Sequence, residues 1–207
     1  MADRRYDAVV FDLLTALLDS WSVWNAVAGS AEDGLRWRRR YLELSYRAGA
    51  YRPYEELVRE AARGAGVGTA CAEKLVARWN ELSPWDEAPR VVGELAQRVP
   101  LGVATNCSQR LGLAAAARCG TKFAVVATAE AVGYYKPRPE PYRAVLATLA
   151  TDPARTLFVA GSAADVPGAR GVGMPVFWHN RMGLAPVDGA APDYAADSLN
   201  PLLELVR

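Results

Sequence analysis

The feature that most constrains the fold is an apolar run near the start of the chain, Ala8-Val9-Val10-Phe11, which ends on Asp12. A continuous run of this length, without alternating polar residues, is typical of a strand buried on both faces, as in a parallel sheet. Open α/β sheets bind their ligands at the carboxyl ends of the strands. Asp12 is therefore a candidate site residue, although an aspartate here is also a favoured cap for a helix that begins near Leu14.

The second half of the chain alternates between strand-like and helical segments. Apolar runs predict strands at 101–104, 123–127, 156–160 and 175–178, with a weaker strand near Tyr194. Helices are predicted between them at 88–98, 111–118 and 142–150, with a short one after Asp165. Such alternation indicates βαβ units with parallel pairing and right-handed crossovers. The predicted fold class is α/β, with a mostly parallel sheet flanked by helices.

The segment between the first strand and this alternating region is predicted to be helical. Helical spacing covers 32–47, Pro53 suits the start of a second helix, and a third helix runs from about 70 to 82. Ser83-Pro84 marks a boundary. We therefore expect an α/β core of residues 1–19 and 85–207, interrupted by an all-helical insertion of residues 20–84.

The helix at 32–47 carries an arginine on its apolar face. Leu35, Leu42 and Tyr46 share this face, and Arg38 falls between them. An arginine there either extends to solvent or meets an anion, and the pattern leaves both interpretations open. A second apolar row must be covered by another helix of the insertion or by a partner subunit: Trp37, Tyr41 and Leu44.

Composition excludes several classes of function. Lys and Arg number 24 and Asp and Glu 23, a net charge of +1, so nothing indicates a nucleic-acid or anionic-membrane partner. Three cysteines without metal-ligand spacing and one histidine, His179, argue against a zinc site, a disulfide framework and a Ser-His-Asp triad. The start of the chain lacks the apolar region of a signal peptide, and no run reaches membrane length. We expect a cytoplasmic protein.

Four strand ends supply polar side chains that would meet at one edge of the sheet. Asp12 ends the first strand, Thr105 and Asn106 the next, Lys136 lies in the loop after the third, and Asp165 follows the fourth. Each residue also has a purely structural interpretation. Thr105, Asn106 and Asp165 are residue types that cap helices, and Lys136 would then be an ordinary surface lysine. The chain has three lysines in all, and prolines stiffen the loop of Lys136, which favours a functional role.

In this order the strand ends resemble the four motifs of the haloacid dehalogenase (HAD) superfamily. The resemblance spans nearly the whole chain, including the helical insertion, and is strongest for the L-2-haloacid dehalogenase branch. It implies a HAD-like Rossmannoid core with an all-helical cap. The segments that carry it are Phe11-Asp12, Trp37-Arg38, Leu42-Glu43, Thr105-Asn106, Lys136-Pro137, Tyr142, Asp165, Gly168-Ala169-Arg170 and Trp178-His179-Asn180-Arg181.

The resemblance also implies roles. Asp12 would be the nucleophile, attacking carbon or phosphorus to give an ester or an acyl phosphate, and Lys136 would keep it ionised. Thr105 would hydrogen-bond the nucleophile or the intermediate, and Asn106 would orient the substrate. Asp165 would hold Lys136 or activate the hydrolytic water. Substrate contacts are implied for three further residues, with the first binding a carboxylate or the departing anion: Arg38, Tyr142 and Ser162.

Two positions decide between carbon and phosphorus. Phosphatases of this superfamily carry a second Asp two residues after the nucleophile and another Asp in the last motif that holds magnesium. Leu14 and Gly161 stand at those places here. An alkoxide leaves poorly without an acid, whereas a halide needs no proton, and a hard cation requires negative ligands. We expect no metal and no cofactor, with Mg²⁺ needed only if the protein is a phosphatase.

The chain also departs from the dehalogenase pattern. Thr15-Ala16 stands where that branch usually has Gly-Thr, and the segment from Ala160 to Asp165 represents its Ser-Ser-Asn-x-x-Asp. The first hypothesis is a cofactor-independent hydrolase of a small 2-substituted carboxylic acid; a strained ring amine such as azetidine-2-carboxylate would also fit. The alternatives are a phosphatase of a small phosphorylated metabolite and a non-catalytic binding protein of this fold. Similar dehalogenases are dimers, which favours a homodimer.

Overall fold

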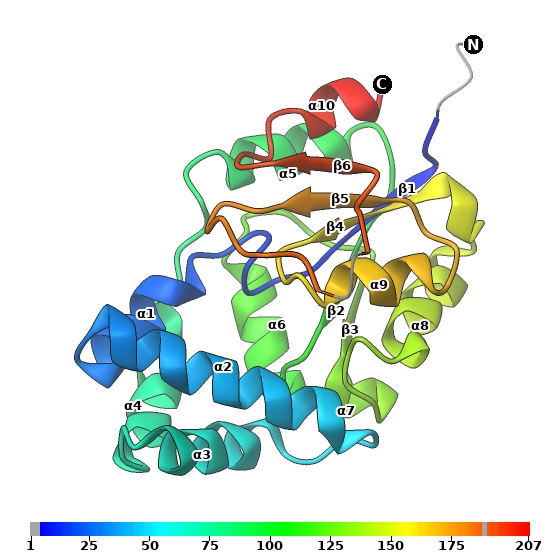
Figure 1. Ribbon diagram of the computed structural model, residues 1–207. Coiled ribbons are helices and arrows are strands. Elements are labelled where there is room, and N and C mark those ends of the chain that lie inside the picture. The colour runs from blue at the N-terminus through cyan, green and yellow to red at the C-terminus, as the bar shows by residue number, and fades with distance from the viewer. Residues whose placement is uncertain (1–4, 188–189) are drawn as a thin grey trace.

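The computed structural model describes residues 5–187 and 190–207; the first four residues, which contributed to the argument against a signal peptide, lie outside it. Within this part of the chain one sheet has six strands in the order β3-β2-β1-β4-β5-β6, and all neighbours are parallel (Figure 1). The predicted α/β class is confirmed. The strands are β1 (Ala8–Phe11), β2 (Leu101–Thr105), β3 (Val125–Thr128), β4 (Thr156–Ala160), β5 (Val176–His179) and β6 (Tyr194–Ala196).

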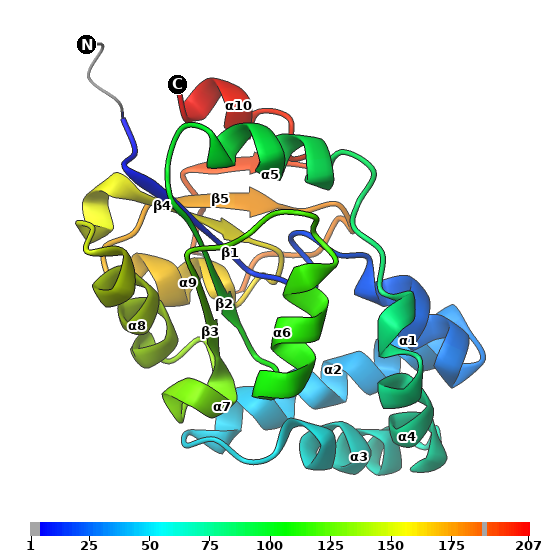
Figure 2. The same cartoon turned by 180° about the vertical axis from the view of Figure 1, so that it is seen from behind.

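Two layers of helices cover the sheet, and the period-2 alternation of β1 divides its side chains between them. Val9 and Phe11 belong to one buried cluster with α5 (Ala88–Ala96), α6 (Gln109–Ala117) and α10 (Leu202–Leu205). Val10 belongs to a second cluster with α8 (Pro139–Leu149) and α9 (Asp165–Arg170). Figure 2 shows α5 and α6 on the face turned away in Figure 1. Burial on both faces explains the uninterrupted apolar run of β1.

A group of helices follows β1 and lies beside the carboxyl ends of the strands (Figure 1). It consists of α1 (Ser20–Ala28), α2 (Ala31–Ala48), α3 (Tyr54–Ala65), α4 (Ala70–Ala77) and a 3₁₀ turn η1 (Trp79–Glu81). The predicted helix at 32–47 is confirmed, and Pro53 precedes α3 as expected. The helix predicted to reach residue 82 ends at Ala77 instead and passes into η1. Short helices α7 (Ala129–Val132) and η2 (Pro153–Arg155) complete the fold.

The second apolar row of α2 is covered within the chain. The Trp37 ring lies 4.5 Å from the ring of Trp24 on α1, and the Tyr41 ring lies 5.4 Å from the ring of Tyr54 on α3. Leu44 is partly buried against the same cluster. This row therefore needs no partner subunit, and the homodimer stays a prediction.

The chain after Asp12 forms a tight turn and not the helix that the capping interpretation required. The N–H groups of Leu17 and Leu18 both donate to the carbonyl of Leu13, and α1 begins only at Ser20. The Ser20 hydroxyl donates back to the Leu14 carbonyl. The turn thus leads the chain directly from β1 into the helical group. None of the helices in the described ranges combines the length and apolar character needed to cross a bilayer.

Candidate active site

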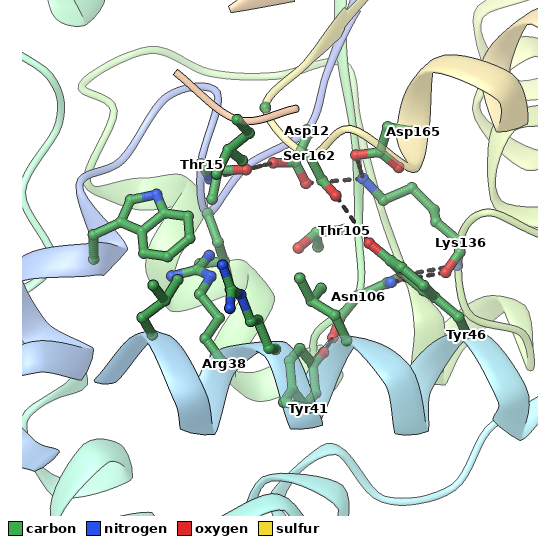
Figure 3. Close-up of a pocket in the computed structure, with 17 residues that line it drawn as sticks. Asp12, Thr15, Arg38, Tyr41, Tyr46, Thr105, Asn106, Lys136, Ser162 and Asp165 are labelled. Carbon is green, nitrogen blue, oxygen red and sulfur yellow. Dashed lines mark hydrogen bonds and ion pairs between the residues drawn. The ribbon is translucent and has the colours of Figure 1, made fainter. Parts of the chain in front are cut away.

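A cavity of about 120 Å³ lies where α2 faces the carboxyl ends of β1, β2 and β4 (Figure 3). The three strands are neighbours in the sheet, so residues from distant parts of the sequence meet there. Seven of the eight predicted site residues line this cavity: Asp12, Arg38, Thr105, Asn106, Lys136, Ser162 and Asp165. The eighth, Tyr142, is not among the lining residues and lies behind Asp165.

Lys136 is buried between two carboxylates. Its Nζ donates to Asp12 Oδ1 at 2.8 Å and to Asp165 Oδ2 at 2.9 Å, and the residue is 2% exposed. A lysine is almost never buried in this way unless it is paired. Lys136 is therefore no surface lysine, and Asp165 is no simple helix cap, because Ala164 holds the capping position of α9 and the Asp165 oxygens accept from Lys136 and Tyr142.

The three charges set one another's protonation states. Burial opposes ionisation of Asp12, but the Lys136 ammonium and the hydrogen bonds from Lys136 and Thr15 outweigh it, so the pKa of Asp12 lies below its ordinary value. Burial also opposes the charge on Lys136, but Asp12 and Asp165 raise its pKa above that of a free lysine. At neutral pH the site thus holds an ionised Asp12 beside a permanently charged Lys136.

Asp165 differs from Asp12 in its environment. Burial and the nearby charge of Asp12 raise its pKa, and Lys136 and the Tyr142 hydroxyl, which donates to Oδ1 at 2.8 Å, only partly offset this. Two carboxylates that share one lysine therefore have pKa values pushed in opposite directions. Such a divergence is typical of a pair with separate roles, one as nucleophile and one as proton acceptor.

Asn106 and Thr105 do not cap the next helix, because Ser108 occupies the capping position of α6. The Asn106 side chain instead accepts from the Lys136 N–H at 2.7 Å and donates to the Lys136 carbonyl at 3.0 Å. Asn106 therefore fixes the backbone that carries the ammonium. Thr105 lines the cavity, and its hydroxyl donates to Cys107 Sγ at 3.4 Å.

Thr15 contacts Asp12 in the cavity, although its place in the sequence indicated only a departure from the dehalogenase pattern. Asp12 Oδ2 accepts from the Thr15 hydroxyl at 2.6 Å, from the Thr15 N–H at 3.2 Å and from the Ala16 N–H at 3.4 Å. The two oxygens of Asp12 thus have separate partners: Oδ2 holds the turn that follows β1, and Oδ1 meets Lys136. The sequence feature that could have indicated this contact is a hydroxyl residue three positions after Asp12.

Arg38 is buried and has no ion-pair partner in the described ranges. It is 6% exposed, its Nη1 donates to Ser20 Oγ at 2.8 Å, and its guanidinium carbon lies 4.1 Å from the centre of the Trp21 ring. Burial lowers the pKa of Arg38 and the Asp12 charge raises it, but a guanidinium stays charged in either case. Arg38 therefore does not extend to solvent, and its positive charge lies at one end of the cavity.

Two tyrosines of α2 also reach the cavity (Figure 3). The Tyr41 hydroxyl donates to the Asn106 carbonyl at 2.9 Å, and the Tyr46 hydroxyl shares a hydrogen bond with Ser162 Oγ at 2.9 Å. The sequence placed Tyr46 on the face of Arg38, which is correct, but gave no reason to assign its hydroxyl a role.

The site does not suit a magnesium ion. Leu14 and Gly161 both line the cavity, and a Cβ at Gly161 would lie 2.3 Å from the Thr15 hydroxyl oxygen and from the Ala16 nitrogen, so no aspartate fits there. Lys136 already occupies the space between Asp12 and Asp165. Across the residues described, no group of three or more acidic, histidine or cysteine side chains is arranged to hold a metal.

A buried ion pair between Asp12, at the end of β1, and Lys136, in the loop after α7, with a helical group beside it, is typical of hydrolases that use an aspartate nucleophile. The family model for haloacid dehalogenase-like hydrolases matches residues 6–173. The chain belongs to this family, and the predicted resemblance is confirmed.

Individual relatives show which members of the family the chain is similar to along most of its length. The chain is 30% identical to (S)-2-haloacid dehalogenase H-109 of Pseudomonas putida over 194 residues, which cover 86% of this chain and 87% of that protein. It is 27% identical to an L-2-haloacid dehalogenase of known crystal structure, with a TM-score of 0.86 over 97% of this chain and 98% of the other. A pyrophosphatase of Bacillus mycoides is 33% identical, but over 41% of this chain and 40% of its own. Both dehalogenases match along most of the chain.

Proposed function

We propose that the protein hydrolyses a small 2-halogenated carboxylic acid at C2 through a covalent Asp12 ester, without a metal or other cofactor. The observation that carries the proposal is an ionised, buried carboxylate in the same cavity of about 120 Å³ as a buried arginine that has no ion-pair partner among the described residues. A carboxylate nucleophile and a guanidinium that line the same small cavity suit a substrate that carries a carboxylate and releases a halide. The matches to dehalogenases over most of the chain support the same reaction.

In the first step one oxygen of Asp12 attacks C2, the carbon–halogen bond breaks, and the halide leaves with the bonding electrons. Lys136 and Thr15 hold the two Asp12 oxygens, so the carboxylate is oriented before the substrate arrives. Arg38 binds the substrate carboxylate or the departing halide. A halide needs no proton, so the hydrophobic Leu14 beside Asp12 costs this step nothing.

In the second step a water molecule attacks Cγ of the Asp12 ester. Asp165 takes a proton from this water and returns it to the leaving oxygen of the 2-hydroxy acid. The bond between Asp12 and the product oxygen breaks, and the regenerated carboxyl releases the second proton of the water. Lys136 stays charged throughout, because its pKa is raised, and Tyr142 orients Asp165 from behind.

The helices α1–α4 act in this proposal as a cap, with the boundary predicted at residues 20–84. Apolar side chains from this segment and the turn after β1 line the cavity around the reacting carbon: Leu14, Trp21, Leu35 and Leu42. They exclude bulk water from the ester and leave room for a small C2 substituent only.

The test is halide release from L-2-chloropropionate in the presence of a chelator, beside hydrolysis of an aryl phosphate with Mg²⁺, with Asp12→Asn as the blank for both. We expect metal-independent halide release that the variant lacks. In H₂¹⁸O, repeated turnover should place ¹⁸O in the peptide that contains Asp12, because water attacks Cγ. Magnesium-dependent phosphate release without halide would favour a phosphatase, and no turnover or ester with any small haloacid would favour a binding protein.

A further inference from the structure

The hydroxyls of Tyr46 and Ser162 form a pair that the reaction described above does not use. Tyr46 comes from the last turn of α2, and Ser162 lies in the loop after β4. Their oxygens are 2.9 Å apart, and both residues line the cavity. Figure 3 shows the two side chains meeting beside Asp12, on the side of Lys136 and away from Arg38.

This pair has unused hydrogen-bonding capacity. Each hydroxyl has one donor and two lone pairs, and one hydrogen bond uses a single donor and a single lone pair. In the described part of the chain, neither hydroxyl makes a second hydrogen bond with protein atoms. One donor and several lone pairs therefore face the cavity, where a further polar molecule would satisfy them.

The charges around the pair favour a neutral molecule over an anion. Burial and the charge of Asp165 raise the pKa of Tyr46, and Asp12 acts in the same direction, while Ser162 and Lys136 only partly oppose them. Two carboxylates, Asp12 and Asp165, surround the pair together with one ammonium, that of Lys136, so the charge near the Tyr46 hydroxyl is negative on balance. An anionic carboxylate or halide binds more favourably at Arg38, and water is the neutral molecule that the reaction requires.

We propose that Tyr46 and Ser162 together hold the hydrolytic water beside Asp12, so that the C-terminal end of α2 contributes to hydrolysis of the ester, whereas Arg38 of the same helix acts in its formation. The Asp165 N–H donates to the Ser162 carbonyl at 3.1 Å, so one turn fixes both the water and the base that accepts its proton. In this proposal the two hydroxyls position the water by hydrogen bonds, and Asp165 alone accepts its proton. The inference rests on the proposed function.

The experiment separates the two steps. Wild type and Tyr46→Phe are mixed rapidly with L-2-chloropropionate, quenched in acid and examined by intact mass and by halide release. We expect the variant to release one halide per active site at close to the wild-type rate, and then to accumulate the ester because its hydrolysis is about tenfold slower. Ser162→Ala should behave alike, and the double variant should be little worse than either single one, because the hydroxyls act as a unit.

Tyr41→Phe is the matched control. Tyr41 lies on the same helix, and its hydroxyl also donates a hydrogen bond to the α/β core, at the Asn106 carbonyl. This hydroxyl does not belong to the Tyr46–Ser162 pair. We expect this variant to leave the ratio of the two rate constants unchanged and to accumulate no ester. A slower halide burst or a raised KM in Tyr46→Phe, without ester, would overturn the inference, because the hydroxyl would then bind substrate. If wild type itself releases no halide, the proposed function fails as well.

Discussion

Replacing Lys136 with methionine tests the charge arrangement at the centre of the site. The substitution keeps an unbranched side chain, one atom shorter, but removes the ammonium that lies 2.8 Å from Asp12 and 2.9 Å from Asp165. Two buried carboxylates would then face each other without a cation. Such a pair relieves its repulsion by binding a proton, as the carboxylates of aspartic proteases do.

The size of the effect follows from that proton. Removing one partner of a buried ion pair costs about 3–5 kcal/mol, and protonating a carboxyl of ordinary pKa near 4 at pH 7 costs about 4 kcal/mol. With a urea dependence of about 2 kcal/mol per M, the midpoint of unfolding should fall by about 1.5–2.5 M at pH 7.

The loss of stability in Lys136→Met should also depend on pH, and it should be larger at high pH than at low pH. In the wild type the pKa of Asp12 is lowered, so its contribution to stability is present above the unfolded pKa and is lost as the pH falls through the folded value. In the variant the carboxylate pair has a raised pKa in the folded protein. Binding of the shared proton therefore stabilises the folded state at low pH, and this stabilisation is lost as the pH rises. The difference between the two proteins should shrink by about 1.4 kcal/mol for each unit from pH 7 to pH 5.

Urea unfolding followed by tryptophan fluorescence at pH 5, 6 and 7 measures this difference. Lys122→Met is the control, because Lys122 is exposed and lies outside the cavity. The control should match the wild type at each pH. A Lys136→Met midpoint equal to that of the wild type, or a difference that does not change with pH, would refute the charge arrangement.

Three further predictions address single features of the site. Arg38→Met should lower kcat/KM for halide release by roughly 10–150-fold, since a hydrogen bond to a charged group contributes about 1.5–3 kcal/mol; a change within twofold would contradict anion binding by Arg38. Gly161→Ala should destabilise the protein by about 1–3 kcal/mol in thermal unfolding, because its Cβ meets the Thr15 turn, whereas Gly93→Ala, with open space around its Cβ, should be neutral or slightly stabilising. The rate of the halide burst should stay level from about pH 8 down to about pH 5, because the pKa of Asp12 is lowered; a fall above pH 5 would argue against Lys136 as its partner.

Elements with sharp ends were predicted well from the sequence. Strand β4 spans the predicted residues 156–160, since its apolar run is continuous and both ends are polar or flexible. Helix α8 begins at Pro139, three residues before the prediction, because a proline in the first turn lacks only an N–H that would be unpaired there anyway. Helix α1 was not distinguished within the insertion. The face opposite its buried residues carries Ser22, Asn25 and Ala26, none of which is charged, so the sequence shows no strongly polar stripe that would reveal the helical period.

Some residues of the candidate site were also predictable from the sequence, and others were not. Residues that end strands were predicted because parallel strands bring their carboxyl ends to one edge. The burial of Arg38 was not predictable, because it depends on Ser20 and Trp21 from α1, whose position is set by packing. The hydroxyls of Thr15 and Tyr46 come from a turn and from a helix that crosses the sheet edge, and no local pattern reports where such side chains point.

The order of the two proposed steps follows from the charges alone. Before reaction, the negative charge of Asp12 is one of the factors that raise the pKa of Asp165. Ester formation neutralises Asp12 and transfers its charge to the halide, which leaves towards the Arg38 end of the cavity. Lys136 then has one carboxylate left to stabilise, so the pKa of Asp165 falls and its ionised form is favoured. The first step thus secures the proton acceptor that the second step requires, with one lysine in place of a metal ion.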